Sequence, residues 1–292
     1  TATATAWIAD LHVARQGEAK PKRAATVATA ANIGGLGLGP LVGGILAQWV
    51  DAPLTTPYVV ALVAMAIGFV AVAVTPETTA AIDPKPAYRP QRVAVPAEAR
   101  GIFFFAALGT AIAFAALGLF SSLAPSFIAG ELHHTSRALA GAAAFIVFTS
   151  AALTQTLAAS WAPRRQLQRG TAAMVVGPLL LVVSVWLPSP SLALFLVGGA
   201  VSGMATGLLF KGALGTVAAV APADRRAEAL SGIFLAGYLG LTVPVVGLGI
   251  LTQVVAADVS LTLFAALLTI GALVAARPVL RPAPKARELA TA

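Results

Sequence analysis

The sequence contains no cysteine. These residues can therefore form no disulfide framework, thiolate metal site or cysteine nucleophile. Charged residues are also scarce, because they make up 10% of the chain, whereas globular domains carry about 25%. A chain without cysteine fits both oxidising and reducing compartments, but the shortage of charge argues against a water-soluble globular protein.

Chemical motifs are missing as well. The sequence has no nucleophile–base pair, phosphate-binding loop or zinc spacing, and Gly35-Leu-Gly37-Leu-Gly39 follows no strand and lacks the third glycine of a dinucleotide loop. The pair His133–His134 beside Glu131 offers too few convergent ligands for a metal. We therefore expect neither an enzyme, nor a cofactor, nor a bound metal.

What the chain has in excess is apolar residues. They form 58% of the sequence, and the mean hydropathy is +0.88. The 27 glycines and 19 prolines would break soluble helices but are tolerated in packed membrane helices. The sequence predicts an all-α polytopic membrane protein whose environment is the lipid bilayer. The net charge of +8 is distributed along loops, so we expect no nucleic-acid partner.

Apolar segments of about 20 residues predict membrane-spanning helices. The first runs from Arg23 to Trp49 and the second over 57–74. A proline-rich polar stretch, 75–100, predicts a linker. Six further spans are expected at 101–124, 138–161, 170–187, 191–213, 228–251 and 256–276, followed by a polar tail over 277–292.

Residues 1–9 are apolar but reach less than half the length of a spanning helix. No layout of basic, apolar and cleavage regions indicates a signal peptide. We therefore expect the chain to begin within a helix, with its N-terminal portion missing.

The basic residues indicate the orientation. Arg137 is the one lysine or arginine predicted to lie in an outside loop. The positive-inside rule places the other basic regions, and with them the C-terminus, in the cytoplasm. These regions are 10–23, 75–100, 162–169, 211–227 and 277–292, which hold 18 of the 19 lysines and arginines.

Small residues recur every four positions in the first span, at Ala31, Gly35, Gly39, Gly43 and Ala47. This spacing places them on one helix face, where a neighbouring helix can approach closely. A proline within this ridge is expected to bend the helix, because it removes one backbone donor.

The segment Gly35-x-x-x-Gly39-Pro40-x-x-Gly43-Gly44 resembles the signature on the fifth helix of major facilitator superfamily (MFS) transporters that is associated with antiporters. The glycines either gate the transporter or only pack the helix.

Three other segments bear on this resemblance. Pro76-Glu77-Thr78 is similar to the sequence that often closes the first half of these proteins, and Ala221–Ser231 is similar to the entry to the eleventh helix. The Ser160–Arg169 segment retains the arginines expected between the eighth and ninth helices but lacks the aspartate.

The resemblance implies two helical bundles, the first incomplete. Residues 1–74 would hold the end of the fourth helix with the fifth and sixth, and 101–276 the seventh to twelfth. It also implies alternating access around a site near the membrane midplane. We expect a monomeric cell-membrane exporter of small organic molecules driven by proton antiport. An uptake or facilitated-diffusion carrier and an inactive truncated scaffold are the alternatives.

Polar side chains within the spans are candidates for a substrate path, although each could equally bond to a neighbouring helix or to its own backbone. The spans contain no central carboxylate, so a proton-coupling group is expected in helices before Thr1. Lys211 is expected to reach the cytoplasmic surface by snorkelling. The path candidates are Asn32, Gln155, Thr206 and Tyr238, and the candidates for a cytoplasmic charge network are Asp10, Arg164, Arg165, Arg225, Arg226 and Glu228.

Overall fold

The computed structural model describes residues 21–76, 97–222 and 225–280, without the side chains of residues 21–33, 97, 279 and 280. All regular elements of these residues are helices, which confirms the predicted all-α architecture. Seven helical segments in the described part of the chain are long and apolar enough to cross a membrane.

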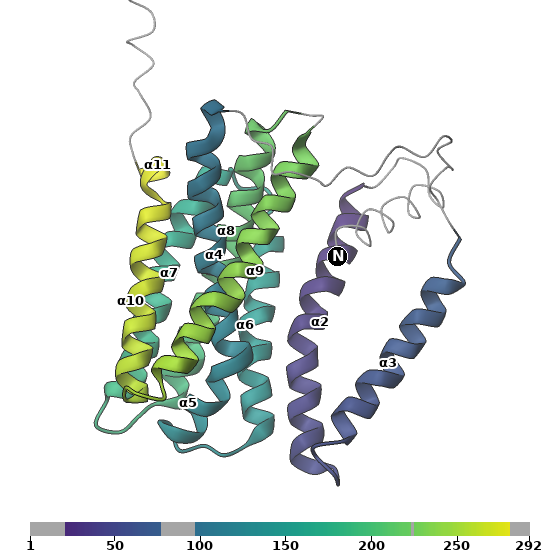
Figure 1. Cartoon of the computed structure of the whole chain (residues 1–292), viewed down its shortest axis with the longest axis vertical. Helices are drawn as coiled ribbons and strands as arrows, with labels where there is room; N and C mark the ends of the chain where they lie inside the picture. The colour runs from purple at the N-terminus through teal and green to yellow at the C-terminus, as the bar shows by residue number, and fades with distance from the viewer. Residues whose placement is uncertain (1–20, 77–96, 223–224, 281–292) are drawn as a thin grey trace, which may run out of the picture.

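The helices follow the predicted spans in order and alternate in direction (Figure 1). The long helices are α2 (Pro21–Trp49), α3 (Thr56–Ala73), α4 (Arg100–Gly118), α6 (Arg137–Leu157), α7 (Pro163–Trp186), α8 (Leu192–Val220), α9 (Arg226–Leu251) and α10 (Ala257–Ala275). The shorter elements are η1 (Ala97–Ala99), η2 (Leu119–Leu123), α5 (Ala124–Gly130) and α11 (Arg277–Leu280).

Two predicted loops are wrong in part. The arginine-rich segment after Ala162 is helical, because Pro163 occupies the first turn of α7, where its missing amide donor costs nothing. The Gln166 side chain supports this start by donating a hydrogen bond to Ala158 O at 2.7 Å. Helix α8 also continues to Val220, past the predicted end of its span, and stops just before Pro222.

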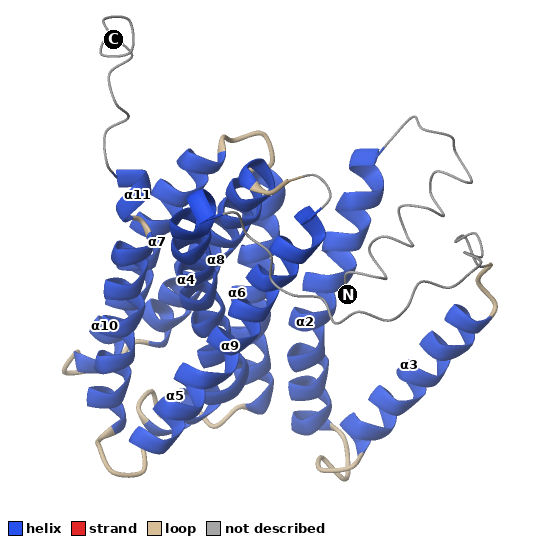
Figure 2. Ribbon diagram, turned by 45° about the horizontal axis from the view of Figure 1, so that its top comes forward, coloured by secondary structure: helices blue, strands red, loops and turns tan. Residues whose placement is uncertain are grey.

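Helices α4 and α6 to α10 form one bundle in which α8 contacts α4, α6, α7 and α9. Helix α2 packs along α6, and α3 contacts α2 (Figure 2). No residue of α3 is buried. Helices α4, α6, α7 and α9 therefore surround α8, whereas α2 and α3 lie to one side of the bundle.

Close helix contacts in the bundle depend on glycine. A Cβ atom on Gly203 would overlap Val147 O, and one on Gly207 would overlap Ala151 O, both on α6. These glycines let the α6 and α8 backbones touch, which stabilises helix pairs in a bilayer, where lipid tails are as apolar as leucine. Gly203 and Gly207 thus form a packing surface between α6 and α8.

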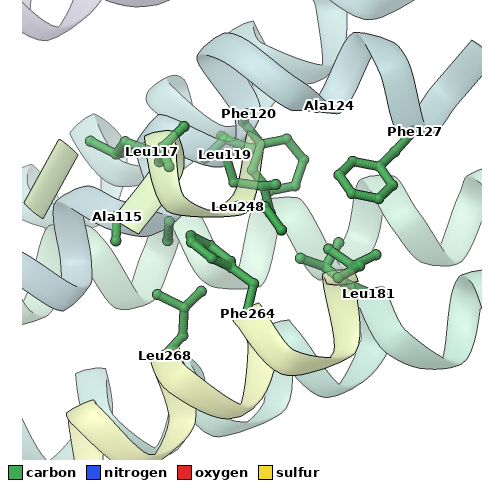
Figure 3. Close-up of a cluster of buried hydrophobic side chains, with 14 of the residues drawn as sticks. Ala115, Leu117, Leu119, Phe120, Ala124, Phe127, Leu181, Leu248, Phe264 and Leu268 are labelled. Atoms are coloured by element: carbon green, nitrogen blue, oxygen red, sulfur yellow. The ribbon is translucent and has the colours of Figure 1, made fainter. Parts of the chain in front are cut away.

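Large apolar side chains fill the centre of the bundle (Figure 3). The Phe120 ring lies 5.5 Å from that of Phe195, measured between ring centroids, and both side chains are fully buried. Leu181, Leu248 and Phe264 add buried side chains from α7, α9 and α10. Side chains from five helical elements thus fix the positions of the helices that surround α8.

The span predicted for 101–124 is longer and contains an irregularity. Helix α4 passes through a π-helical turn, η2, into α5, so the continuous segment is Arg100–Gly130. Pro125 in the first turn of α5 cannot donate to the preceding turn, which favours a change of hydrogen-bond pattern there. Ser121 Oγ donates to Gly118 O at 3.2 Å and satisfies one of the carbonyls of this turn.

Replacing His133 with glycine is expected to stabilise the protein. His133 has φ of 56°, and His134 N donates to Ile128 O at 2.9 Å, as at a helix end with a left-handed residue. Such a backbone costs a non-glycine residue about 1 kcal/mol. Thermal unfolding in detergent should therefore show a midpoint about 2 °C higher for His133→Gly. His134→Gly, at a neighbour without positive φ, is the control, and an unchanged or lower midpoint for His133→Gly would contradict the expectation.

Candidate functional site

Helices α2 and α6 approach to backbone contact where the first part of the chain meets the bundle. A Cβ atom on Gly44 would lie 2.6 Å from Arg137 O and 3.2 Å from Gly141 Cα. A Cβ atom on Gly141 would overlap Pro40 O. Only glycine fits at Gly44 and Gly141, so the two helices touch there without intervening side chains.

The ridge suggested by the four-residue spacing does not make this contact. A Cβ atom on Gly35, Gly39 or Gly43 would meet nothing within 4 Å. Gly37 instead faces α6, where an added Cβ atom would lie 3.1 Å from Phe148 Cβ. The face of α2 that touches the bundle therefore includes Gly37 and Gly44, and no other described residue packs against the Gly35–Gly39–Gly43 face.

Two side chains join the ends of α2 and α6 reciprocally. Arg137 donates from its backbone N to Gln48 Oε1 at 2.8 Å and from Nη1 to Ala47 O at 3.0 Å. Gln48 thus satisfies a donor at the start of α6, and Arg137 satisfies a carbonyl at the end of α2. The arginine charge also complements the negative end of the α2 dipole. We call this arrangement the Gln48–Arg137 clamp.

A cleft of about 300 Å³ lies beside this contact, between α2, the η2–α5 segment and α6. Its wall includes Pro40 and Gly43 on α2, Phe120 and Ser121 on η2, and Arg137 on α6. The open face of α2 at Gly43 therefore borders a space next to the π-helical turn, and a movement of α2 relative to η2 would change its volume.

Aromatic rings from three helices form a second feature. The Phe114 ring lies 5.1 Å from Phe210 and 6.5 Å from Tyr238, and Phe210 lies 5.5 Å from Phe234, measured between ring centroids. Tyr238 is half exposed at the edge of this cluster. The ring edges and faces offer a stacking surface for a planar or aromatic molecule.

The predicted path residues differ in their surroundings. Thr206 is buried, and its hydroxyl lies 2.9 Å from Ala113 O and 3.0 Å from Ser202 O, so it links α8 to α4. Asn32 belongs to α2, but its side chain lies outside the described residues. Of the four candidates, Tyr238 and Gln155 have accessible side chains in the structure.

Gln155 and Lys211 come to the same level of neighbouring helices. Val147 O on α6 lies opposite Gly203 on α8, and Ala151 O lies opposite Gly207. Because both helices advance together by four residues, the next pair is Gln155 with Lys211. The snorkelling interpretation of Lys211 remains a prediction.

Arg137 lies at the opposite end of the bundle from the basic starts of α4, α7 and α9 (Figure 1). Of the predicted charge network, Asp10 lies outside the described residues. Arg165 packs on Trp161, with Cζ 4.9 Å from the ring centroid. Glu228 lies in the first turn of α9, where the helix dipole favours a carboxylate.

Two further features bear on the chemistry of this site, namely potential metal ligands and a second cavity. Within residues 21–76, 97–222 and 225–280 no three potential metal-binding side chains converge.

A cavity of about 240 Å³ at the basic end of the bundle is lined mainly by apolar groups, with Arg164 and Thr216 as its polar side chains. The described groups can bind an organic molecule by apolar and stacking contacts.

Comparison with known protein families identifies the family of this chain. The family model described as Major Facilitator Superfamily matches residues 104–292, which is more than half of the chain. The match begins in α4, so it covers the bundle around α8 and not α2 or α3. No curated protein matches the sequence. The chain therefore belongs to the Major Facilitator Superfamily, whose members transport small molecules across membranes.

Proposed function

We propose that the protein exports small organic molecules by alternating access, in exchange for protons. The contact between α2 and α6 is the observation that carries the proposal. Helix α2 packs along α6, and the two backbones touch near one membrane face, through Gly44, Gly141 and the Gln48–Arg137 clamp. A contact of this kind can close one side of a pathway and part to open it.

Orientation follows from the charges. Because the positive-inside rule assigns the basic ends of the helices to the cytoplasm, the clamp would lie at the outer face. The present arrangement would then correspond to a protein closed toward the outside. Proton coupling is supported by the resemblance of Gly35–Gly44 to the antiporter signature.

The aromatic cluster indicates a class of substrate to test. Phe114, Phe210 and Tyr238 belong to α4, α8 and α9, whose mutual contacts hold the rings together. Stacking on such rings favours planar aromatic molecules. Ethidium is a suitable probe, since it is planar, cationic and fluorescent.

Everted membrane vesicles from cells that express the protein provide the test. After an inward-acid pH gradient is imposed, added ethidium should accumulate inside the vesicles and partly dissipate the gradient, as reported by a pH-sensitive dye. A protonophore should abolish both signals, and Tyr238→Ala should reduce accumulation while the protein level stays constant. Dye entry that persists with the protonophore and stops at equal concentrations on both sides would indicate facilitated diffusion. No accumulation of any planar dye would contradict the proposed substrate class.

A further inference from the structure

We propose that the cytoplasmic end of α7 binds the headgroup of an anionic phospholipid through Arg165 and Arg169. The site consists of these two guanidinium groups, Trp161 in the turn before α7, and the exposed apolar face of α7. It lies apart from both the Gln48–Arg137 clamp and the aromatic cluster.

The two arginines share one indole ring. The Cζ atoms of Arg165 and Arg169 lie 4.9 Å and 4.6 Å from the centroid of Trp161, within the range of a cation–π interaction. Trp161 is fixed in turn, because its backbone N donates to Ala158 O at 3.1 Å. The Gln166 side chain bonds to the same carbonyl. The guanidinium groups are thus positioned before any ligand arrives.

Among the described residues, no acidic side chain neutralises this pair. The sequence has no aspartate or glutamate between Glu131 and Asp224, so α6, α7 and α8 contain none. In the described part of the chain no carboxylate forms an ion pair with Arg165 or Arg169. Like charges four residues apart on a helix repel each other. A phosphate between them would relieve this repulsion and match the planar fork of each guanidinium.

The surface beside the arginines indicates a lipid as the source of the phosphate. Ala172, Val176 and Leu179 follow Arg165 and Arg169 on the same helix face, since the spacings are three or four residues. These three side chains are exposed, Val176 by 47% and Leu179 by 57%. Leu179 lies ten residues after Arg169, a helical rise of about 15 Å, which is half of a bilayer core. An acyl chain along this face brings its phosphate to the two arginines.

Native mass spectrometry of the purified protein in detergent tests the proposal, with phosphatidylglycerol and phosphatidylcholine as probes. The protein should retain one phosphatidylglycerol in preference to phosphatidylcholine. Arg165→Gln with Arg169→Gln should weaken retention by about 25-fold, since each arginine near a membrane surface contributes about fivefold. Arg100→Gln with Arg277→Gln removes two exposed arginines from the same end of the bundle and should leave retention unchanged.

Trp161→Leu separates charge from positioning. It keeps both arginines but removes the ring, so retention should fall several-fold while the elution profile and helical content stay unchanged. Equal loss in the Arg100/Arg277 control would overturn the proposal, because retention would then reflect net charge. Equal retention of phosphatidylcholine, or release of the lipid by millimolar inorganic phosphate, would overturn it too, because the site would then not select an anionic lipid.

Discussion

Gly44→Val is expected to reduce transport about tenfold, whereas Gly43→Val should leave it nearly intact. A side chain at Gly44 enters the α2–α6 contact, where a Cβ atom alone already lies 2.6 Å from Arg137 O. The backbone cannot yield as a flexible side chain could, so α2 must move away from α6. Overpacking of this kind costs about 1–3 kcal/mol. Dye accumulation in everted vesicles should fall about tenfold for Gly44→Val, which is the factor that a cost of about 1.4 kcal/mol represents.

The matched control for this prediction is the adjacent glycine. A Cβ atom on Gly43 meets nothing within 4 Å, although both glycines belong to the same signature and to the same turn of α2. Valine has the same effect on helix propensity at both positions, so a difference between the variants must come from the contact with α6. Equal transport by the two variants would show that the α2–α6 contact is not needed for function.

The pattern of the sequence predicted most of the fold. The absence of charge within apolar segments located the spans, and α2, α3, α9 and α10 begin and end within two residues of the predicted limits. The segment that begins with α4 continues to Gly130, past its predicted end, and α6 ends at Leu157, four residues before its predicted limit of 161. The limits failed most at the basic ends of α7 and α8. At these ends the helix continues beyond the apolar core, because the residues have sufficient helical propensity and, in α7, because Pro163 fits the first turn. Hydropathy alone does not identify helical turns made of polar residues.

The glycine contact shows why the site was predicted only in part. A four-residue spacing identifies which glycines share a helix face, but not which face meets a neighbour. Gly35, Gly39 and Gly43 have the regular spacing, yet the contact uses Gly44 and its partner Gly141. The partner could not be identified from α2 alone, because contact requires a matching small residue about a hundred positions later in the chain.

The Gln48–Arg137 clamp was not predicted for a similar reason. Both residues were expected near the same membrane face, since Arg137 was assigned to an outside loop and Gln48 to the end of the first span. A sequence gives no distance between two loops, however, and exposed polar residues are common at helix ends. The hydrogen bonds of 2.8 Å and 3.0 Å become visible only when the packing of α2 on α6 is known.

Breaking the Gln48–Arg137 clamp is expected to let the end of α2 separate from the start of α6. Arg137→Ala removes the hydrogen bond from Arg137 Nη1 to Ala47 O but keeps the one from the backbone N of residue 137 to Gln48 Oε1. Gln48→Ala removes only the hydrogen bond to Gln48 Oε1. Each bond is exposed, so each substitution should cost about 1 kcal/mol, which shifts a two-state equilibrium about fivefold. Because Gln48 and Arg137 are in contact, their effects are coupled, and the double variant should shift the equilibrium by more than either single variant and by at most about 25-fold.

Distances between spin labels at Leu54 and His134 can measure this shift, because the chain has no native cysteine to compete for the label. Both positions are exposed, and Leu54 follows α2 while His134 precedes α6. The double variant should increase the population of molecules with long distances between the labels. Compared with Arg137→Ala, Arg137→Lys keeps the charge and one donor, so it should show a larger population with short distances. Identical distance distributions in all variants would show that the glycine contact alone holds α2 against α6. In that case the clamp would only cap the two helices.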